Sequence, residues 1–151
     1  IQLAVKWGLK FSHIDNHMWV AAAGPEFFRI YLETARAYGV AAYIPKWILY
    51  NGEMEEAYRQ SGFRKVDASI TLAGGSYEGK KEAFYKQLEA IGPGLNIITI
   101  HPVIDTPEIR EIVTNFQDRN DEYKIFMEDA TAEAMNKNNI RLIGWKDVQC
   151  L

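Results

Sequence analysis

The sequence predicts an α/β fold in which short parallel strands alternate with amphipathic helices. Three observations carry this prediction: apolar, β-branched runs such as LNIITI at 95–100, longer stretches with helical spacing such as 25–38, and glycine or proline at most boundaries. Strands separated by helices are typical of βαβ units, which form parallel sheets. The pattern gives about five strands, which fits either a doubly wound sheet or part of a barrel.

The expected strands are short apolar runs bounded by turn-forming residues. They are 11–15, 40–44, 68–73, 95–100 and 140–145. The expected helices have apolar residues at helical spacing. They are the opening residues up to a cap at Gly8, then 25–38, 53–60, 80–91, a short turn from Pro107, and 118–137 with a break near Glu128 and Asp129. Pro25 suits the first turn of its helix, and Gly39 suits the position just past the end.

The composition indicates one globular domain over residues 1–151. Of the 151 residues, 48% are hydrophobic and 13% aromatic, which is enough for a sizeable core. The net charge of -3 and the lack of any basic run argue against nucleic acid as a partner. No apolar stretch approaches the roughly 20 residues of a membrane span, and no signal peptide is visible, so we expect a cytoplasmic protein without membrane contact. The one cysteine, Cys150, excludes an intrachain disulfide.

Three histidines are the candidates for chemistry, because imidazole is the commonest metal ligand and the usual acid–base group near neutral pH. His13 and His17 lie in the segment SHIDNH. If residues 11–17 are extended, His13, Asp15 and His17 share one face of the strand. This set suits a divalent metal such as zinc, or one metal ligand together with the carboxylate that orients it. The alternative is a pair of half-buried histidines that bond only to the backbone.

The third histidine, His101, follows the most apolar strand in the segment IITIHP. Pro102 cannot extend a central strand, so the chain must turn there. An imidazole at that edge is placed for proton transfer. A polar residue that merely ends the strand is the alternative.

These segments together resemble one known family. SHIDNHM is similar to the Thr/Ser-His-x-Asp-x-His signature of the YdjC-like carbohydrate deacetylases, which include the diacetylchitobiose deacetylases. IITIHP, RNDEY at 119–123 and the closing IRLIGWKDV are similar to later segments of that family. The resemblance runs in order from Gln2 to Val148, and four segments in the right order make it specific.

The resemblance implies a partial (β/α) barrel of the polysaccharide-deacetylase type, its C-terminal portion. It implies a metal-dependent hydrolase with one divalent metal, zinc or magnesium, that removes N-acetyl groups from amino sugars of short N-acetylated oligosaccharides. Carried over by motif, His17 is a metal ligand, while Asp15 and His13 belong to the shell that orients it. His101 is the general acid that protonates the leaving amine.

Two segments of the family are not found in this sequence. One is an Asp-Asp-x-Gly segment with a metal-binding Asp and the base, and the other is a Gly-x-His segment with a further ligand. A complete barrel runs to roughly 250 residues, and this chain begins with Ile1 inside an expected helix. The resemblance therefore implies that the N-terminal part is absent and that this chain alone is inactive. Because a truncated barrel exposes sheet edges, we expect it to associate with that part or to form a homo-oligomer.

Two aromatic residues depart from the family's pattern. Tyr43 stands where the family often has an arginine, and Trp19 stands where one more histidine often follows the ligand. Trp19, Tyr43 and Trp47 are candidates for substrate binding, because an aromatic ring near His17 can stack on a sugar. Trp145 is a weaker candidate of the same kind, and ordinary packing is the alternative for each.

Two other functions remain open. One is a non-catalytic carbohydrate-binding or interaction domain on the same fold, which the many Trp and Tyr residues and the absent base favour. The other is a different metal hydrolase that acts on an ester or a phosphoryl group, because Tyr43 replaces an expected arginine.

Overall fold

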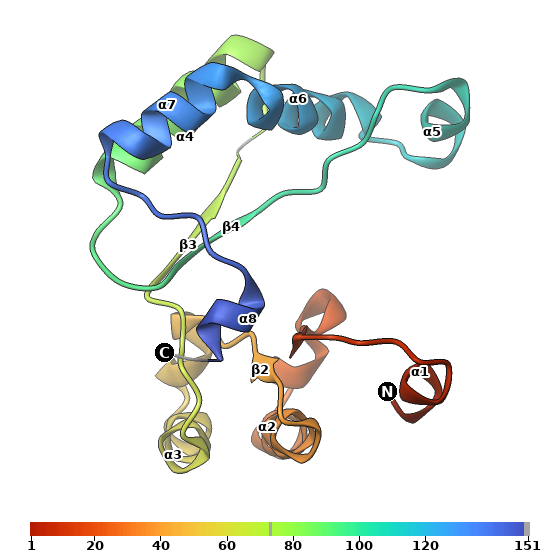
Figure 1. Cartoon of the computed structure of the whole chain (residues 1–151), viewed down its shortest axis with the longest axis vertical. Coiled ribbons are helices and arrows are strands. Elements are labelled where there is room, and N and C mark those ends of the chain that lie inside the picture. The colour runs from red at the N-terminus through yellow and green to blue at the C-terminus, as the bar shows by residue number, and fades with distance from the viewer. Residues whose placement is uncertain (73, 150–151) are drawn as a thin grey trace. The chain divides into compact units, whose positions relative to one another are not determined.

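The computed structural model describes residues 1–72 and 74–149, and these form two compact units (Figure 1). Unit 1 comprises Ile1–Asp67 together with the stretch that begins at Ile143, and unit 2 comprises Ala68–Leu142. Cys150 lies outside the described residues. Each unit contains one pair of parallel strands with helices packed against it.

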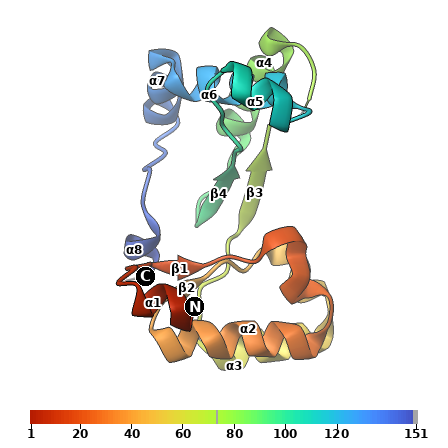
Figure 2. The same ribbon diagram turned by 90° about the vertical axis from the view of Figure 1, so that its right-hand side faces the viewer.

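Unit 1 is built on the parallel pair β1 (His13–Ile14) and β2 (Ala41–Ala42). The helix that packs on this pair is α2 (Pro25–Tyr38), which Figure 2 draws along its full length. The remaining elements of the unit are α1 (Gln2–Lys6), the 3₁₀ helices η1 (His17–Ala22) and η2 (Lys46–Tyr50), α3 (Gly52–Ser61) and α8 (Trp145–Val148).

The core of unit 1 follows from the spacing of apolar residues on α2. Phe28, Tyr31, Leu32 and Ala35 recur at three- and four-residue intervals, so they lie on one face and are buried. They pack against residues of β2 and η2, and the buried set is completed by Ala21, Val40, Ala42, Ile44, Ile48 and Met54. The helix ends where Gly39 adopts a left-handed conformation with φ of 62°.

Unit 2 is built on β3 (Ala68–Thr71) and β4 (Asn96–Thr99), which pair in parallel from Ala68 opposite Asn96 to Thr71 opposite Thr99. Its helices are α4 (Tyr77–Ala90), α5 (Pro107–Ile112), α6 (Phe116–Met127) and α7 (Asp129–Lys137). The buried core consists of Ile70, Phe84, Leu88, Ile125 and Met135.

Most expected elements are confirmed, including parallel pairing, the helix at 25–38 and the helix break at Glu128. Glu128 has an extended conformation between α6 and α7, which interrupts the helix. The strands are shorter than expected, at two to four residues. Within the described ranges the strands form two separate two-stranded sheets and no closed barrel.

The expected strand at 140–145 is wrong. Leu142 is 79% exposed, and no strand is assigned over these residues. Trp145 instead begins α8, because Gly144 caps that helix through a hydrogen bond from its N–H to Asp147 Oδ2 at 2.8 Å. The apolar run is therefore an extended connection that ends at a helix. No helix in the described part of the chain has the length and apolar character to cross a bilayer.

Candidate active site

The carboxyl edge of the strand pair in unit 1 is held by one buried hydroxyl. Tyr31 projects from α2, and its hydroxyl donates to the Ile14 carbonyl at 2.7 Å. The Tyr43 carbonyl lies 3.2 Å from the same hydroxyl, which also accepts a hydrogen bond from the Tyr43 N–H at 2.9 Å. Burial raises the pKa of the Tyr31 phenol, so this group stays protonated. Tyr31 therefore joins the ends of β1 and β2 at the point where SHIDNH leaves the sheet.

The segment that follows β1 is an exposed turn built by its own side chains. Asp15 accepts a hydrogen bond from the Asn16 N–H at 2.6 Å, and Asn16 Oδ1 accepts one from the Ala21 N–H at 3.2 Å. His17 is exposed and opens η1. The structure thus places Asp15 and His17 on one short turn, open to solvent.

The backbone just after His17 is strained. Met18 and Trp19 have φ angles of 53° and 58°, the left-handed region that non-glycine residues rarely adopt. Each such residue costs about 1–2 kcal/mol, and residues of this kind gather at functional sites. The strain marks the His17 turn as a candidate site independently of the histidine itself.

A chain of ring contacts surrounds this turn. Trp19 contacts Tyr43 at 5.4 Å and Trp47 at 5.1 Å between ring centroids. Tyr43 contacts Trp145 at 6.0 Å, and Trp145 stacks on the imidazole of His13 at 4.5 Å with the planes 9° apart. Trp19 and Trp47 remain 39% and 46% exposed, whereas Tyr43 is buried. The three expected substrate-binding residues are therefore neighbours in this cluster, and two of them present ring surface to solvent.

His13 differs from His17 in its surroundings. Its Nδ1 lies 3.3 Å from Ser12 Oγ, and Trp145 covers one face of its ring. Burial lowers the pKa of His13, and the nearby Asp15 carboxylate opposes that change. His13 is therefore biased toward the neutral form, which suits a hydrogen-bonding role beside a metal-binding histidine.

The donors in unit 1 fit a divalent metal in kind but not in number. His17 offers an imidazole nitrogen and Asp15 a carboxylate oxygen, which are common zinc ligands. Among the described residues, no three His, Cys, Asp or Glu side chains gather as a metal-binding group.

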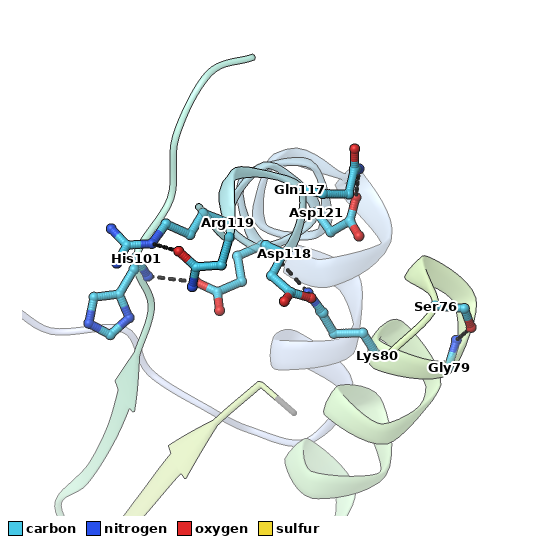
Figure 3. A network of polar contacts seen from close by, with 10 residues as sticks. Ser76, Gly79, Lys80, His101, Gln117, Asp118, Arg119 and Asp121 are labelled. Atoms are coloured by element: carbon cyan, nitrogen blue, oxygen red, sulfur yellow. Dashed lines mark hydrogen bonds and ion pairs between the residues drawn. The ribbon is translucent and has the colours of Figure 1, made fainter. Parts of the chain in front are cut away.

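His101 lies in unit 2, just beyond the end of β4. Its N–H donates to Glu122 Oε2 at 2.6 Å. The Val103 N–H donates to the Arg119 carbonyl at 3.3 Å, and the Asn120 amide donates to the Val103 carbonyl at 3.0 Å. In Figure 3 the imidazole of His101 points away from Arg119 and α6. The segment RNDEY thus fixes the backbone at His101 and leaves its imidazole exposed.

The family model for YdjC-like proteins matches residues 1–137 of the chain. The chain belongs to the YdjC-like family. The resemblance stated from SHIDNH, IITIHP and RNDEY is therefore confirmed, and these three segments lie inside the matched range.

A solved structure resembles this YdjC-like chain in fold. It is a protein from Enterococcus faecalis V583, provisionally described as a cellobiose-phosphate cleavage protein, with a TM-score of 0.69 and 18% sequence identity. The match covers 95% of this chain and 55% of the other, so the chain spans about half the length of that protein. No curated protein sequence matches the chain.

Within this YdjC-like chain, unit 1 contains six of the seven expected site residues, and unit 2 contains His101. The roles of these seven residues stay predictions. Sequence reasoning missed what Tyr31 and Trp145 contact. Tyr31 lies within the expected helix at 25–38, and nothing in the pattern signals that its hydroxyl joins two strand ends. Trp145 was expected in a strand, whereas it stacks on His13 from the start of α8.

Proposed function

We propose that this chain carries part of the active site of a metal-dependent carbohydrate N-deacetylase, within a (β/α) barrel of the polysaccharide-deacetylase type. The observation that carries the proposal is the exposed His17 on a strained turn at the carboxyl edge of parallel strands, next to exposed tryptophans. That edge is where α/β proteins build their sites. The substrate class is an amino sugar with an N-acetyl group, in a short oligosaccharide.

The proposed reaction is hydrolysis of the acetamide bond. Water adds to the acetamide carbonyl carbon, the C–N bond breaks, acetate leaves, and the amine nitrogen takes up a proton. When bound, a zinc or magnesium ion supplies polarisation of that carbonyl and activation of the water. His17 would serve as one ligand of this ion, and Asp15 and His13 would keep that imidazole in place.

His101 has a separate role in this proposal. As an imidazolium it gives its proton to the departing nitrogen, because an unprotonated amine is a poor leaving group. The Glu122 carboxylate holds the backbone N–H of His101, so the imidazole side chain remains free to serve the reaction. The exposed faces of Trp19 and Trp47 would take the apolar face of a sugar ring, with buried Tyr43 supporting Trp19.

The test combines metal content with acetate release, on the protein at its full natural length and on residues 1–151 alone. We expect near one metal ion per chain in the full-length protein, and acetate from an N-acetylated chito-oligosaccharide. His17→Ala should lower the metal content, whereas His101→Ala should leave it unchanged and lower the rate by about 10²- to 10⁴-fold. The proposal fails if the metal-loaded protein releases no acetate and His17→Ala leaves metal content unchanged.

A second candidate is a non-catalytic carbohydrate-binding domain. The exposed Trp19 and Trp47 favour it, because contiguous aromatic surface is suited to sugar binding without any chemistry. Sugar binding that survives both metal removal and His101→Ala, with no acetate released, would favour this candidate. A panel of esters and phosphate esters, tested on the same metal-loaded protein, separates both candidates from a different metal hydrolase.

A further inference from the structure

Trp145 contacts the candidate site although it lies in the C-terminal stretch of unit 1, far from that site in the sequence. It is the first residue of α8, yet its indole lies flat on the imidazole of His13, with 4.5 Å between centroids and 9° between planes. The indole of Trp145 therefore lies against one face of the His13 imidazole.

Hydrogen bonds hold the short helix that carries the indole. Asp147 accepts from the Gly144 N–H at 2.8 Å and donates its own N–H to the Gly144 carbonyl at 2.9 Å, which closes the first turn of α8. Gln149 Nε2 donates to the Gly39 carbonyl at 2.9 Å, which ties α8 to the end of α2. A helix of four residues is unstable in isolation, so these contacts account for its presence.

Tyr43 provides a further support for Trp145. Its ring meets the indole edge-on, with 6.0 Å between centroids and 61° between planes. Tyr43 is buried, and its backbone is bound by the hydroxyl of Tyr31. The rigid strand ends and the indole therefore form one connected support behind His13.

The imidazole of His13 is constrained on a face and at one nitrogen. Trp145 occupies the face, and Ser12 Oγ lies 3.3 Å from Nδ1. A half-buried imidazole without such contacts can turn about its side-chain torsions. The Ser12 hydroxyl can donate to Nδ1 or accept from it, depending on the tautomer, so the two contacts constrain the orientation of the ring rather than its tautomer.

We propose that Trp145 is a positioning residue of the candidate site, whose indole holds the imidazole of His13 in one orientation. The proposal rests on the proposed function only in assigning the turn of Asp15 and His17 to the active site. The orientation of His13 matters because small misplacements of supporting groups can cost about 10²-fold in rate. Trp145 thus acts through His13 rather than on substrate.

A competing role for Trp145 is a sugar-stacking platform. One face of the indole is already taken by His13, and Tyr43 contacts the ring as well. Trp19 and Trp47 have the freer surface, at 39% and 46% exposure. These contacts favour a positioning role for Trp145 and a sugar-stacking role for Trp19 and Trp47.

The deciding experiment is histidine NMR on residues 1–151 with Trp145→Ala and Trp145→Phe, at about pH 8, where a histidine is neutral. The chain has three histidines, so His13→Gln assigns the His13 signals. We expect one side-chain rotamer of His13 in the unchanged chain and in Trp145→Phe. Trp145→Ala should give averaging between rotamers of His13. Trp7→Ala is the matched control, because Trp7 is exposed and is not among the rings that contact His13.

A second readout uses the full-length protein and an N-acetylated chito-oligosaccharide. Trp145→Ala should lower kcat by about 10- to 100-fold with little change in KM, and Trp145→Phe should keep most of the rate. The proposal is overturned if His13 keeps one side-chain rotamer in Trp145→Ala, or if KM rises while kcat is unchanged. If no acetate is released from any protein, the proposed function fails, and the NMR result still decides the role of Trp145.

Discussion

The two units share a plan but use their polar and aromatic side chains differently. Both have a parallel strand pair covered by helices. Unit 1 gathers exposed tryptophans, a strained turn and two histidines beside its strand ends. In unit 2, polar side chains join helices to one another, as in the ion pair of Lys80 on α4 with Asp118 on α6 (Figure 3). Backbone strain and exposed aromatic surface mark the candidate site of unit 1, whereas the polar networks of unit 2 join its helices and leave His101 as the one proposed site residue of that unit.

A second network in unit 2 makes the same point. Glu128, at the break between α6 and α7, contacts Lys81 Nζ at 2.5 Å and accepts from the hydroxyls of Tyr77 and Tyr85. The hydrogen bond to Glu128 raises the pKa of Tyr77 to about 12. These groups belong to helices α4 and α6–α7 of the same unit, so the network fastens the helix layer.

The sequence itself provides a way to follow the units separately. All four tryptophans, Trp7, Trp19, Trp47 and Trp145, belong to unit 1, and Ala68–Leu142 has none. Tryptophan fluorescence therefore reports unfolding of unit 1, while far-UV circular dichroism reports the helices of both units. If the two probes give different unfolding transitions, the two units differ in stability.

The largest expected effect concerns the buried lysine of unit 2. The side chain of Lys80 is 1% exposed and its Nζ lies 2.9 Å from Asp118 Oδ1, whereas Asp118 is 47% exposed. Asp118→Ala leaves a buried ammonium whose remaining bond is to the Asp118 carbonyl. We expect a loss of about 3 kcal/mol in the free energy of unfolding, measured by urea denaturation.

The control is a substitution of Lys80, which should lower the free energy of unfolding much less than Asp118→Ala does. Lys80→Met removes the buried charge and leaves a carboxylate that water can solvate, so a change below about 1 kcal/mol is expected. The double variant should recover most of the loss caused by Asp118→Ala. Circular dichroism should detect the loss before tryptophan fluorescence does. Coincident transitions of the two probes would show that the units unfold together and would break the comparison.

The second effect lies in unit 1, at the hydroxyl that joins the strand ends. Tyr31→Phe keeps the ring in the core and removes the bonds to Ile14 and Tyr43, which leaves buried backbone groups short of a partner. We expect a loss of about 1–3 kcal/mol, seen by tryptophan fluorescence in urea. Tyr38→Phe on the same helix is the control and should change little. Equal losses in the two variants would contradict the role given to the Tyr31 hydroxyl.

How much could be predicted depends on whether a feature is local. The helix at 25–38 is decided by Pro25, Gly39 and the spacing between them, all of which can be read from the sequence. The segment SHIDNH could be predicted as a candidate site from its two histidines alone. The stack of Trp145 on His13 could not, because it depends on a contact between distant segments. The expected strand at 140–145 was wrong for a related reason, since an apolar run becomes a strand only where another strand pairs with it.

The strained backbone of Met18 and Trp19 was equally invisible to pattern reasoning. Neither residue is a glycine, so nothing in the sequence signals a left-handed conformation. Trp19 packs on Tyr43 and Trp47, which belong to a later segment of the chain, so its surroundings cannot be read from the local sequence. Strain of this kind is decided by tertiary structure and becomes evident only there.

The smallest expected effect is a pH dependence confined to unit 1. Burial lowers the pKa of His13 below the usual 6.5, with Asp15 opposing. The unfolded chain then binds more protons than the folded one as pH falls below about 6.5. Stability is therefore full above that pH and declines as pH falls through the lowered pKa. Because the ring is only partly buried, the decline should be slight.

Urea denaturation followed by tryptophan fluorescence at about pH 5 and pH 8 should show a smaller difference in the free energy of unfolding for His13→Gln than for the unchanged chain. If His13→Gln keeps the original difference, the decline has another source.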